Sequence, residues 1–168
     1  MAQQLWFLRH GEAEPRGTRP DAQRRLNPKG ESQAKRAGIA LARMKVAFAI
    51  VLTSPRQRAL DTARLACLAL GQEPVVHEPL SSGFDADEAL SLAGPGERRV
   101  LLVGHEPDFS QVIHDLTGAR IALRKGGLAA VRLHNGQSDL LLLMRPRELE
   151  CVAAVGDREG EPAVAVKS

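Results

Sequence analysis

Polar residues that could bind and attack a phosphoryl group follow three separate apolar segments of the chain. They are Arg9 and His10 after the first segment, Ser54 and Arg58 after the second, and His105 after the third. Arginine binds phosphoryl oxygens through two parallel hydrogen bonds and stays charged. Imidazole attacks phosphorus when it is neutral and stabilises developing charge when it is protonated. Two histidines and two arginines in equivalent positions therefore indicate phosphate chemistry.

The apolar segments before these residues are predicted to be strands of one sheet. Nearly continuous apolar runs are typical of strands buried on both faces, as in a mainly parallel sheet. We expect strands at 4–8, 48–52, 75–76, 100–103, 128–133 and 139–144, the last two joined by a hairpin at Asn135-Gly136. The carboxyl ends of strands in such a sheet form the crevice where ligands bind. The three polar clusters are therefore expected to converge there.

Helix-start signals lie between the predicted strands. Asn27-Pro28 and Ser54-Pro55 each combine an N-cap residue with a proline suited to the first helical position. Apolar spacing then predicts helices as far as residues 44 and 70, and two more at 107–117 and 85–93. Alternating strands and helices predict an α/β three-layer sandwich, with a mainly parallel central sheet and helices on both faces.

Length and composition narrow the class of protein. The 168 residues suit a single domain, in which we expect a peripheral C-terminal segment from about residue 150. No apolar run approaches the roughly 18 residues of a membrane-spanning helix, and the first residues lack the pattern of a signal peptide. Cys67 and Cys151 provide neither a disulfide framework nor a metal clamp. We therefore expect a cytoplasmic protein that does not act on a membrane.

Charge is distributed unevenly along the chain. The net charge of +3 and the aromatic content of 3% are too low to indicate a nucleic-acid partner. Residues 1–64 nevertheless carry a net charge of +8, and the remainder carries −5. The basic part could border an anion site or be a solvated face. The same two interpretations apply to its rim candidates, which are Arg16, Arg19, Arg24, Arg25, Arg56 and, further along the chain, Lys125.

Three motifs in this order carry a resemblance to a known family. The sequence resembles the histidine phosphatase superfamily in three places. They are LRHGE at 8–12, SP at 54–55 followed by Arg58-Ala59 and Thr62-Ala63, and Gly104-His105. Within this superfamily, the sequence is similar to the phosphohistidine phosphatase SixA group in its short length, in VGHEP at 103–107 and in KGGLA at 125–129. The similarity covers roughly residues 4–145. The resemblance implies a phosphoglycerate mutase-like fold and hydrolysis of a phosphoryl group through a phosphohistidine on the enzyme.

The resemblance also implies roles for single residues. His10 would be the nucleophile, and Arg9, Arg58 and His105 would bind the phosphoryl group with it and stabilise the transition state. Each histidine by itself could be a structural residue at a strand end, but the combination favours the catalytic interpretation. Glu78 occupies the place of the family's proton donor, although it could equally be a surface acid. Glu106 and Asp108 are alternative donors, or acids that complement a helix dipole.

The substrate class is predicted from the length of the segment that could form a lid over the crevice. Only about twenty residues separate Pro79 from Val100, where small-molecule relatives often carry lid helices. An open crevice would admit a phosphorylated side chain, so a phosphohistidine-bearing protein is the expected partner. A phosphatase of small phosphorylated metabolites and a non-catalytic phosphate-binding module are the alternatives. No metal-ligand spacing is present, and neither a metal nor another cofactor is expected.

Overall fold

A six-stranded sheet forms the centre of the computed structural model, which describes residues 2–156. The strands are β1 (Gln3–Arg9), β2 (Ile50–Thr53), β3 (Val75–Val76), β4 (Arg99–Gly104), β5 (Leu128–His134) and β6 (Gln137–Met144). They lie in the order β3-β2-β4-β1-β5-β6. The pairs among β3, β2, β4 and β1 are parallel, whereas β5 and β6 pair antiparallel. The predicted mainly parallel sheet is confirmed.

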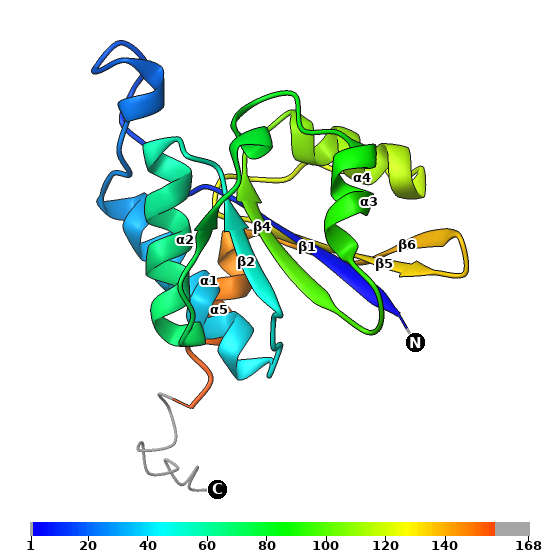
Figure 1. Cartoon of the computed structure of the whole chain (residues 1–168). Coiled ribbons are helices and arrows are strands. Elements are labelled where there is room, and N and C mark those ends of the chain that lie inside the picture. Colours follow the sequence, from blue (N-terminus) through cyan, green and yellow to red (C-terminus); the bar gives the residue numbers. More distant parts are fainter. Residues whose placement is uncertain (1, 157–168) are drawn as a thin grey trace, which may run out of the picture.

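Helices cover both faces of this sheet. Figure 1 shows α1 (Pro28–Arg43), α2 (Gln57–Leu70) and α5 (Pro146–Ala153) on one side, and α3 (Ala86–Ala93) and α4 (Asp108–Thr117) on the other. Two short 3₁₀ turns, η1 (Asp21–Gln23) and η2 (Glu78–Ser81), lie in the connections. The predicted three-layer α/β sandwich is therefore confirmed. Within residues 2–156, none of these helices combines the length and the apolarity needed to cross a membrane.

The central strands are apolar on both faces because each face is covered. Trp6 and Leu8 of β1 belong to the core beneath α1, α2 and α5, and Leu5 and Phe7 belong to the core beneath α3 and α4. All four side chains are buried. The ring of Phe7 packs edge to face on Phe109 of α4, with 5.2 Å between ring centroids. The strand that ends at the predicted site is therefore held rigidly from both sides.

The edge strand β6 departs from this pattern. Its run of leucines predicts burial on both faces, but Leu141 and Leu143 are 39% and 42% exposed. This expectation was wrong because β6 is an antiparallel edge strand and only half-covered. The hairpin that joins it to β5 is confirmed: Asn135 and Gly136 have φ angles of 50° and 74°, as a tight turn of this kind requires.

The two helix-start signals have different outcomes. The Asn27 side chain accepts a hydrogen bond from Gly30 N at 2.9 Å and caps α1 as predicted. The start of α2 was predicted too early, since the first helical residue is Gln57 and the extended residue before it is Arg56. The Ser54 hydroxyl instead accepts from Arg56 N at 3.2 Å within the turn that leads into the helix.

The helix α5 was not predicted. It begins with Pro146 in its first turn, and the backbone N–H of Arg145 donates to the Glu148 side chain at 2.9 Å in a capping box. Leu149 and Ala153 are buried in the core beneath α1 and α2. The segment expected to be peripheral from about residue 150 thus begins inside a packed helix. Its part at 157–168 lies outside the described residues.

Gly38 marks the contact between α1 and α2, and its replacement tests how tightly the helices pack. A Cβ atom there would collide with the carbonyl oxygen of Ala66 in α2. A Gly→Ala change in an open helix interior stabilises by about 0.5–1 kcal/mol. Because the helices would have to separate, we expect Gly38→Ala instead to lower the free energy of unfolding by about 1–3 kcal/mol.

Urea unfolding measures this change. Ser32→Ala, on the exposed face of the same helix, is the matched control and should leave stability unchanged or slightly raised. A Gly38→Ala protein as stable as the wild type would contradict the close approach of the two helices.

Candidate active site

The carboxyl ends of β1, β2 and β4 bring the predicted site residues to one edge of the sheet. His10 follows β1, Ser54 follows β2 and His105 follows β4. Pairing of β1 with β4 continues past the strands, since His10 N donates to Gly104 O at 3.1 Å. The His10 and His105 rings consequently lie with their centroids 5.2 Å apart. Arg58 reaches the same point from the first turn of α2.

The hydrogen bonds of His10 fix its tautomer and leave Nε2 without a proton, as a nucleophile requires. Nδ1 lies 2.7 Å from the carbonyl oxygen of Gly11, which can only accept, so Nδ1 carries the proton. Nε2 therefore holds a lone pair, and Arg58 Nε donates to it at 3.3 Å. Burial, together with the nearby positive charges of Arg58 and Arg9, lowers the pKa of His10 to about 3, although the hydrogen bond to Gly11 opposes this shift. His10 is accordingly neutral at pH 7.

The second histidine of the site is also neutral. His105 Nε2 lies 2.7 Å from the Ser54 hydroxyl. Burial is the main cause that lowers the pKa of His105 to about 3, and the charge of Arg58, with that of His10 where His10 is itself protonated, acts in the same direction. Its Nδ1 atom is buried and has no hydrogen-bond partner among the residues that the structure describes. A buried polar atom without a partner is unfavourable unless a ligand supplies one.

Arg9 contributes a second unpartnered group. Its Nη1 donates to Leu123 O at 2.9 Å, whereas its Nε is buried without a partner. Burial lowers the pKa of Arg9, but a guanidinium remains charged in proteins. Within residues 2–156, Arg9 Nε and His105 Nδ1 are thus the two buried polar atoms of the predicted cluster that have no hydrogen-bond partner.

A carboxylate that the sequence analysis missed completes the cluster. Asp21 Oδ2 lies 3.1 Å from Arg58 Nη2 and 3.0 Å from Arg56 Nη1. Its Oδ1 lies 2.8 Å from Arg24 Nη2. Burial raises the pKa of Asp21, but the hydrogen bonds and charges of Arg24 and Arg58 outweigh it and bring the pKa to about 2. The sequence feature that could have identified Asp21 is its position as the single acid among the arginines of residues 16–25.

Asp21 also changes the interpretation of the rim arginines. Arg24 and Arg56 both contact it, and Arg56 Nε additionally donates to Ser81 Oγ at 3.3 Å. Arg56 therefore borders the cluster rather than projecting into solvent. Arg19 is paired with Glu14 at 2.8 Å, so its charge is already balanced within the loop.

Two glycines allow the loop after His10 to lie against α1. A Cβ atom on Gly11 would come within 2.5 Å of Gly30 O in the first turn of α1. Gly11 N donates to Thr62 Oγ1 at 3.0 Å, and that hydroxyl donates to Arg58 O at 2.7 Å. The loop that carries His10 is thereby tied to both α1 and α2, which fixes its position relative to Arg58.

Glu78 lies in η2, whose Ser81 contacts Arg56 at the rim of the cluster. Glu78 is exposed in η2, and within residues 2–156 it has no hydrogen bond or ion pair to a site residue. The alternative donors are engaged at the start of α4: Glu106 accepts from Ser110 N at 2.9 Å and Asp108 accepts from Phe84 N at 3.3 Å. Among the described residues, Asp21 is the carboxylate that is ion-paired with Arg58 and Arg56, whereas the charge of Glu106 acts on Arg9 and opposes the lowering of its pKa by burial.

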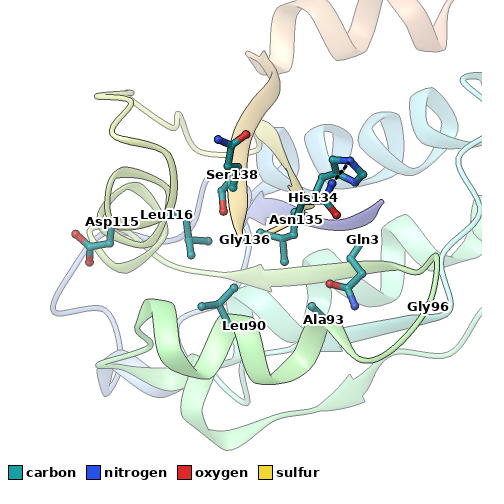
Figure 2. A pocket seen from close by; sticks show the side chains of 12 residues that line it. Gln3, Leu90, Ala93, Gly96, Asp115, Leu116, His134, Asn135, Gly136 and Ser138 are labelled. Carbon is teal, nitrogen blue, oxygen red and sulfur yellow. Dashed lines mark hydrogen bonds between the residues drawn. The ribbon is translucent and has the colours of Figure 1, made fainter. Parts of the chain in front are cut away.

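Two further features of the molecule bear on where chemistry can take place. The described residues contain no group of three or more His, Cys, Asp or Glu side chains that could hold a metal ion. A pocket of about 570 Å³ lies between α3, α4 and the β5–β6 hairpin (Figure 2). Gln3 lines it at the start of β1, the strand whose other end carries His10. The pocket therefore lies away from the cluster.

Comparisons with known proteins agree with this geometry. The model of the histidine phosphatase superfamily (branch 1) matches residues 5–82, which include Arg9, His10 and Arg58. An uncharacterized protein of Picosynechococcus sp. is 32% identical over 164 residues, which cover 87% of this chain and 98% of the relative.

Solved structures extend the similarity over most of the described chain. The protein histidine phosphatase SixA complexed with tungstate superposes with a TM-score of 0.78 at 24% identity, over 87% of this chain and 99% of that chain. A proposed phosphohistidine phosphatase SixA from Nakamurella multipartitia gives a TM-score of 0.69 at 25% identity, over 87% of this chain and 97% of that chain. The chain belongs to the histidine phosphatase superfamily and has the phosphoglycerate mutase-like fold of its SixA-like members.

Proposed function

We propose that this phosphatase hydrolyses a phosphoryl group through a phosphohistidine intermediate on His10, and that its substrate is phosphohistidine in a protein. The observation that carries the proposal is the state of His10, whose unprotonated Nε2 lies beside a buried guanidinium while Nδ1 is held by Gly11 O. A nucleophile of this kind needs no metal for its activation, because the nitrogen already has its lone pair at pH 7.

The proposed reaction has two displacements at phosphorus. His10 Nε2 forms a bond to phosphorus while the bond to the substrate nitrogen breaks. That nitrogen keeps the electron pair, and the substrate ring, already protonated at its other nitrogen, leaves as neutral imidazole. Water then attacks phospho-His10 and its oxygen bonds to phosphorus, so that the product leaves as dihydrogen phosphate carrying the protons of the water, and Nε2 recovers its lone pair while Nδ1 keeps its proton. Arg9, Arg58 and His105 hold the equatorial oxygens throughout. The contribution of the protein is mainly positioning and electrostatic stabilisation.

Among the described residues, no acid that could give a proton to the leaving group is hydrogen-bonded within the cluster, which favours an imidazole leaving group. An alkoxide is strongly basic and must be protonated as it leaves, whereas neutral imidazole leaves readily. Asp21 contacts the cluster but is ionised, and Glu78, Glu106 and Asp108 have no contact with His10 in the part of the chain described. The described site is therefore better suited to phosphohistidine than to an alkyl phosphate.

The segment after η2 supports a protein substrate. It forms α3, which packs against α4, β1 and β4 on one face of the sheet. It is therefore used in the core rather than over the crevice. A phosphatase of small metabolites is the second candidate, because η2, which begins with Glu78, borders the cluster through the Arg56–Ser81 hydrogen bond.

Replacement of the nucleophile tests the proposed activity. His10→Ala should abolish turnover of an aryl phosphate and of a phosphohistidine peptide, together with acid-labile labelling of the protein by radioactive phosphate. His134→Ala, at an exposed histidine of the hairpin, is the control and should retain both. Turnover by His10→Ala at the wild-type rate would contradict the covalent route. A wild-type protein that is inactive on every phosphate tested would instead favour the non-catalytic phosphate-binding module.

The leaving group separates the two candidate substrates. We expect the wild type to have a kcat/KM for phosphohistidine peptides at least about 100-fold higher than for alkyl phosphates, the range that general acids usually supply. Glu78→Gln should reduce alkyl ester hydrolysis more than phosphohistidine hydrolysis, and His105→Ala should reduce both. A wild type that prefers one alkyl ester, with a large loss in Glu78→Gln, would favour the metabolite phosphatase.

Neutral histidines also predict a pH dependence of stability. The pKa values of His10 and His105 are about 3 in the folded protein and would return to an ordinary value of about 6.5 on unfolding. Unfolding therefore takes up protons between these values, and the free energy of unfolding falls as the pH is lowered from about 6.5. Each histidine contributes a slope of up to about 1.4 kcal/mol per pH unit.

Urea unfolding at several pH values between about 4.5 and 7.5 measures this slope. His105→Gln, which keeps a polar group beside Ser54, should reduce it, whereas His134→Ala should not. An unchanged slope in His105→Gln would show that His105 is not the group that takes up the proton.

A further inference from the structure

The guanidinium of Arg58 is held at three of its nitrogens. Nε donates to His10 Nε2 at 3.3 Å, Nη1 donates to the backbone oxygen of Asp21 at 2.8 Å, and Nη2 donates to Asp21 Oδ2 at 3.1 Å. Each terminal nitrogen thus directs one N–H to Asp21 and keeps a second N–H, while the third nitrogen, Nε, donates to the nucleophile. Because a guanidinium is planar and rigid, holding its terminal nitrogens also sets the direction of Nε.

The same carboxylate reaches two other arginines. Its Oδ1 accepts from Arg24 Nε and Nη2 at 3.0 and 2.8 Å, and its Oδ2 also accepts from Arg56 Nη1 at 3.0 Å. One carboxylate therefore pairs with three guanidinium groups, and offsets one of their three charges, at the edge of a site that also holds Arg9. Without it, these positive charges would repel one another and attract any anion more strongly.

Asp21 lies where it can act without supporting the fold. Its side chain is 50% exposed, while that of Arg58 is 6% exposed. Its outer side lines a hollow of about 450 Å³ together with Arg16, Gly17, Arg19 and Arg24. Arg58 also keeps its hydrogen bond to the backbone oxygen of residue 21 whichever side chain is present. An isosteric replacement therefore removes the charge without leaving a cavity in the core.

We propose that Asp21 is a positioning residue that orients Arg58 toward His10 and competes with phosphate for the arginines of the site. The proposal deepens the proposed function and rests on it for its kinetic part. Orientation of Arg58 assists the transition state, whereas competition weakens the binding of the ground-state anion. Loss of the carboxylate should therefore slow turnover and tighten phosphate binding, two effects of opposite sign. A residue that only tied the loop to α2 would change stability and neither of these quantities.

The experiment compares Asp21→Asn with the wild-type full chain. We expect kcat for an aryl phosphate to fall about tenfold or more, because small misplacements of a catalytic group have effects of this size. We expect the Kd for inorganic phosphate, measured by calorimetry, to decrease by about threefold or more, a modest change for a half-exposed charge. Asp21→Glu should recover part of kcat because it restores the charge. Asp21→Ala tests whether the changes come from loss of the carboxylate rather than from new hydrogen bonds of the asparagine amide. Thermal unfolding of every variant shows whether each one is as stable as the wild type.

Glu14→Gln is the matched control. Glu14 belongs to the same loop and pairs with Arg19 at 2.8 Å without contacting Arg58, so its loss removes an equal charge from the loop. It should leave kcat and the Kd for phosphate near the wild-type values.

Three results would overturn the proposal: kcat and Kd within twofold of the wild type in both Asp21→Asn and Asp21→Ala, weaker phosphate binding in both variants, or the same changes in Glu14→Gln. A wild type without turnover on any phosphate would instead refute the proposed function. Calorimetry would still decide the competition for phosphate, since that measurement needs no turnover.

Discussion

Parallel pairing of β1 with β4 is the constraint on which the candidate site depends. The register places Arg9 beside Gly104, so the residues that follow, His10 and His105, leave the sheet at the same level. The two strands are separated by about ninety residues of sequence, yet their ends are fixed by adjacent backbone hydrogen bonds. Burial of β1 on both faces makes this pairing rigid, and the close approach of Gly11 to Gly30 then sets the path of the chain beyond it.

Burial at this edge also determines the charge state of the site. Both histidines are removed from water, which disfavours their protonated forms, and the neighbouring guanidinium groups disfavour them further. The arginines remain charged because their ordinary pKa is far higher. The cluster thus combines neutral nitrogen atoms with permanent positive charge. This combination suits a nucleophile that must attack a phosphoryl group, since the anion is attracted while the attacking atom keeps its lone pair.

Secondary structure could be predicted wherever a local signal and the tertiary environment agreed. Asn27-Pro28 started α1 where expected, and Asn135-Gly136 formed the hairpin, because each signal acts within four or five residues. Ser54-Pro55 misplaced the start of α2 because the serine hydroxyl contacts His105 and the turn before the helix. The helix α5 is short, and its stability comes from burying Leu149 and Ala153 on the core rather than from a long periodic pattern.

The sequence by itself determined the kinds of side chain, their order and their attachment to strand ends. From these, phosphate chemistry at a sheet edge could be predicted, and the resemblance that they carry to the histidine phosphatase superfamily implied the two histidines and two arginines of the site. Only the tertiary structure decided which carboxylate joins them: Asp21, from a loop, contacts Arg58, whereas Glu78 is exposed in η2. The physical reason is that a side chain's distance to a distant segment depends on strand order, register and helix packing. Those are properties of the whole fold, whereas periodicity and capping signals report only on neighbours along the chain.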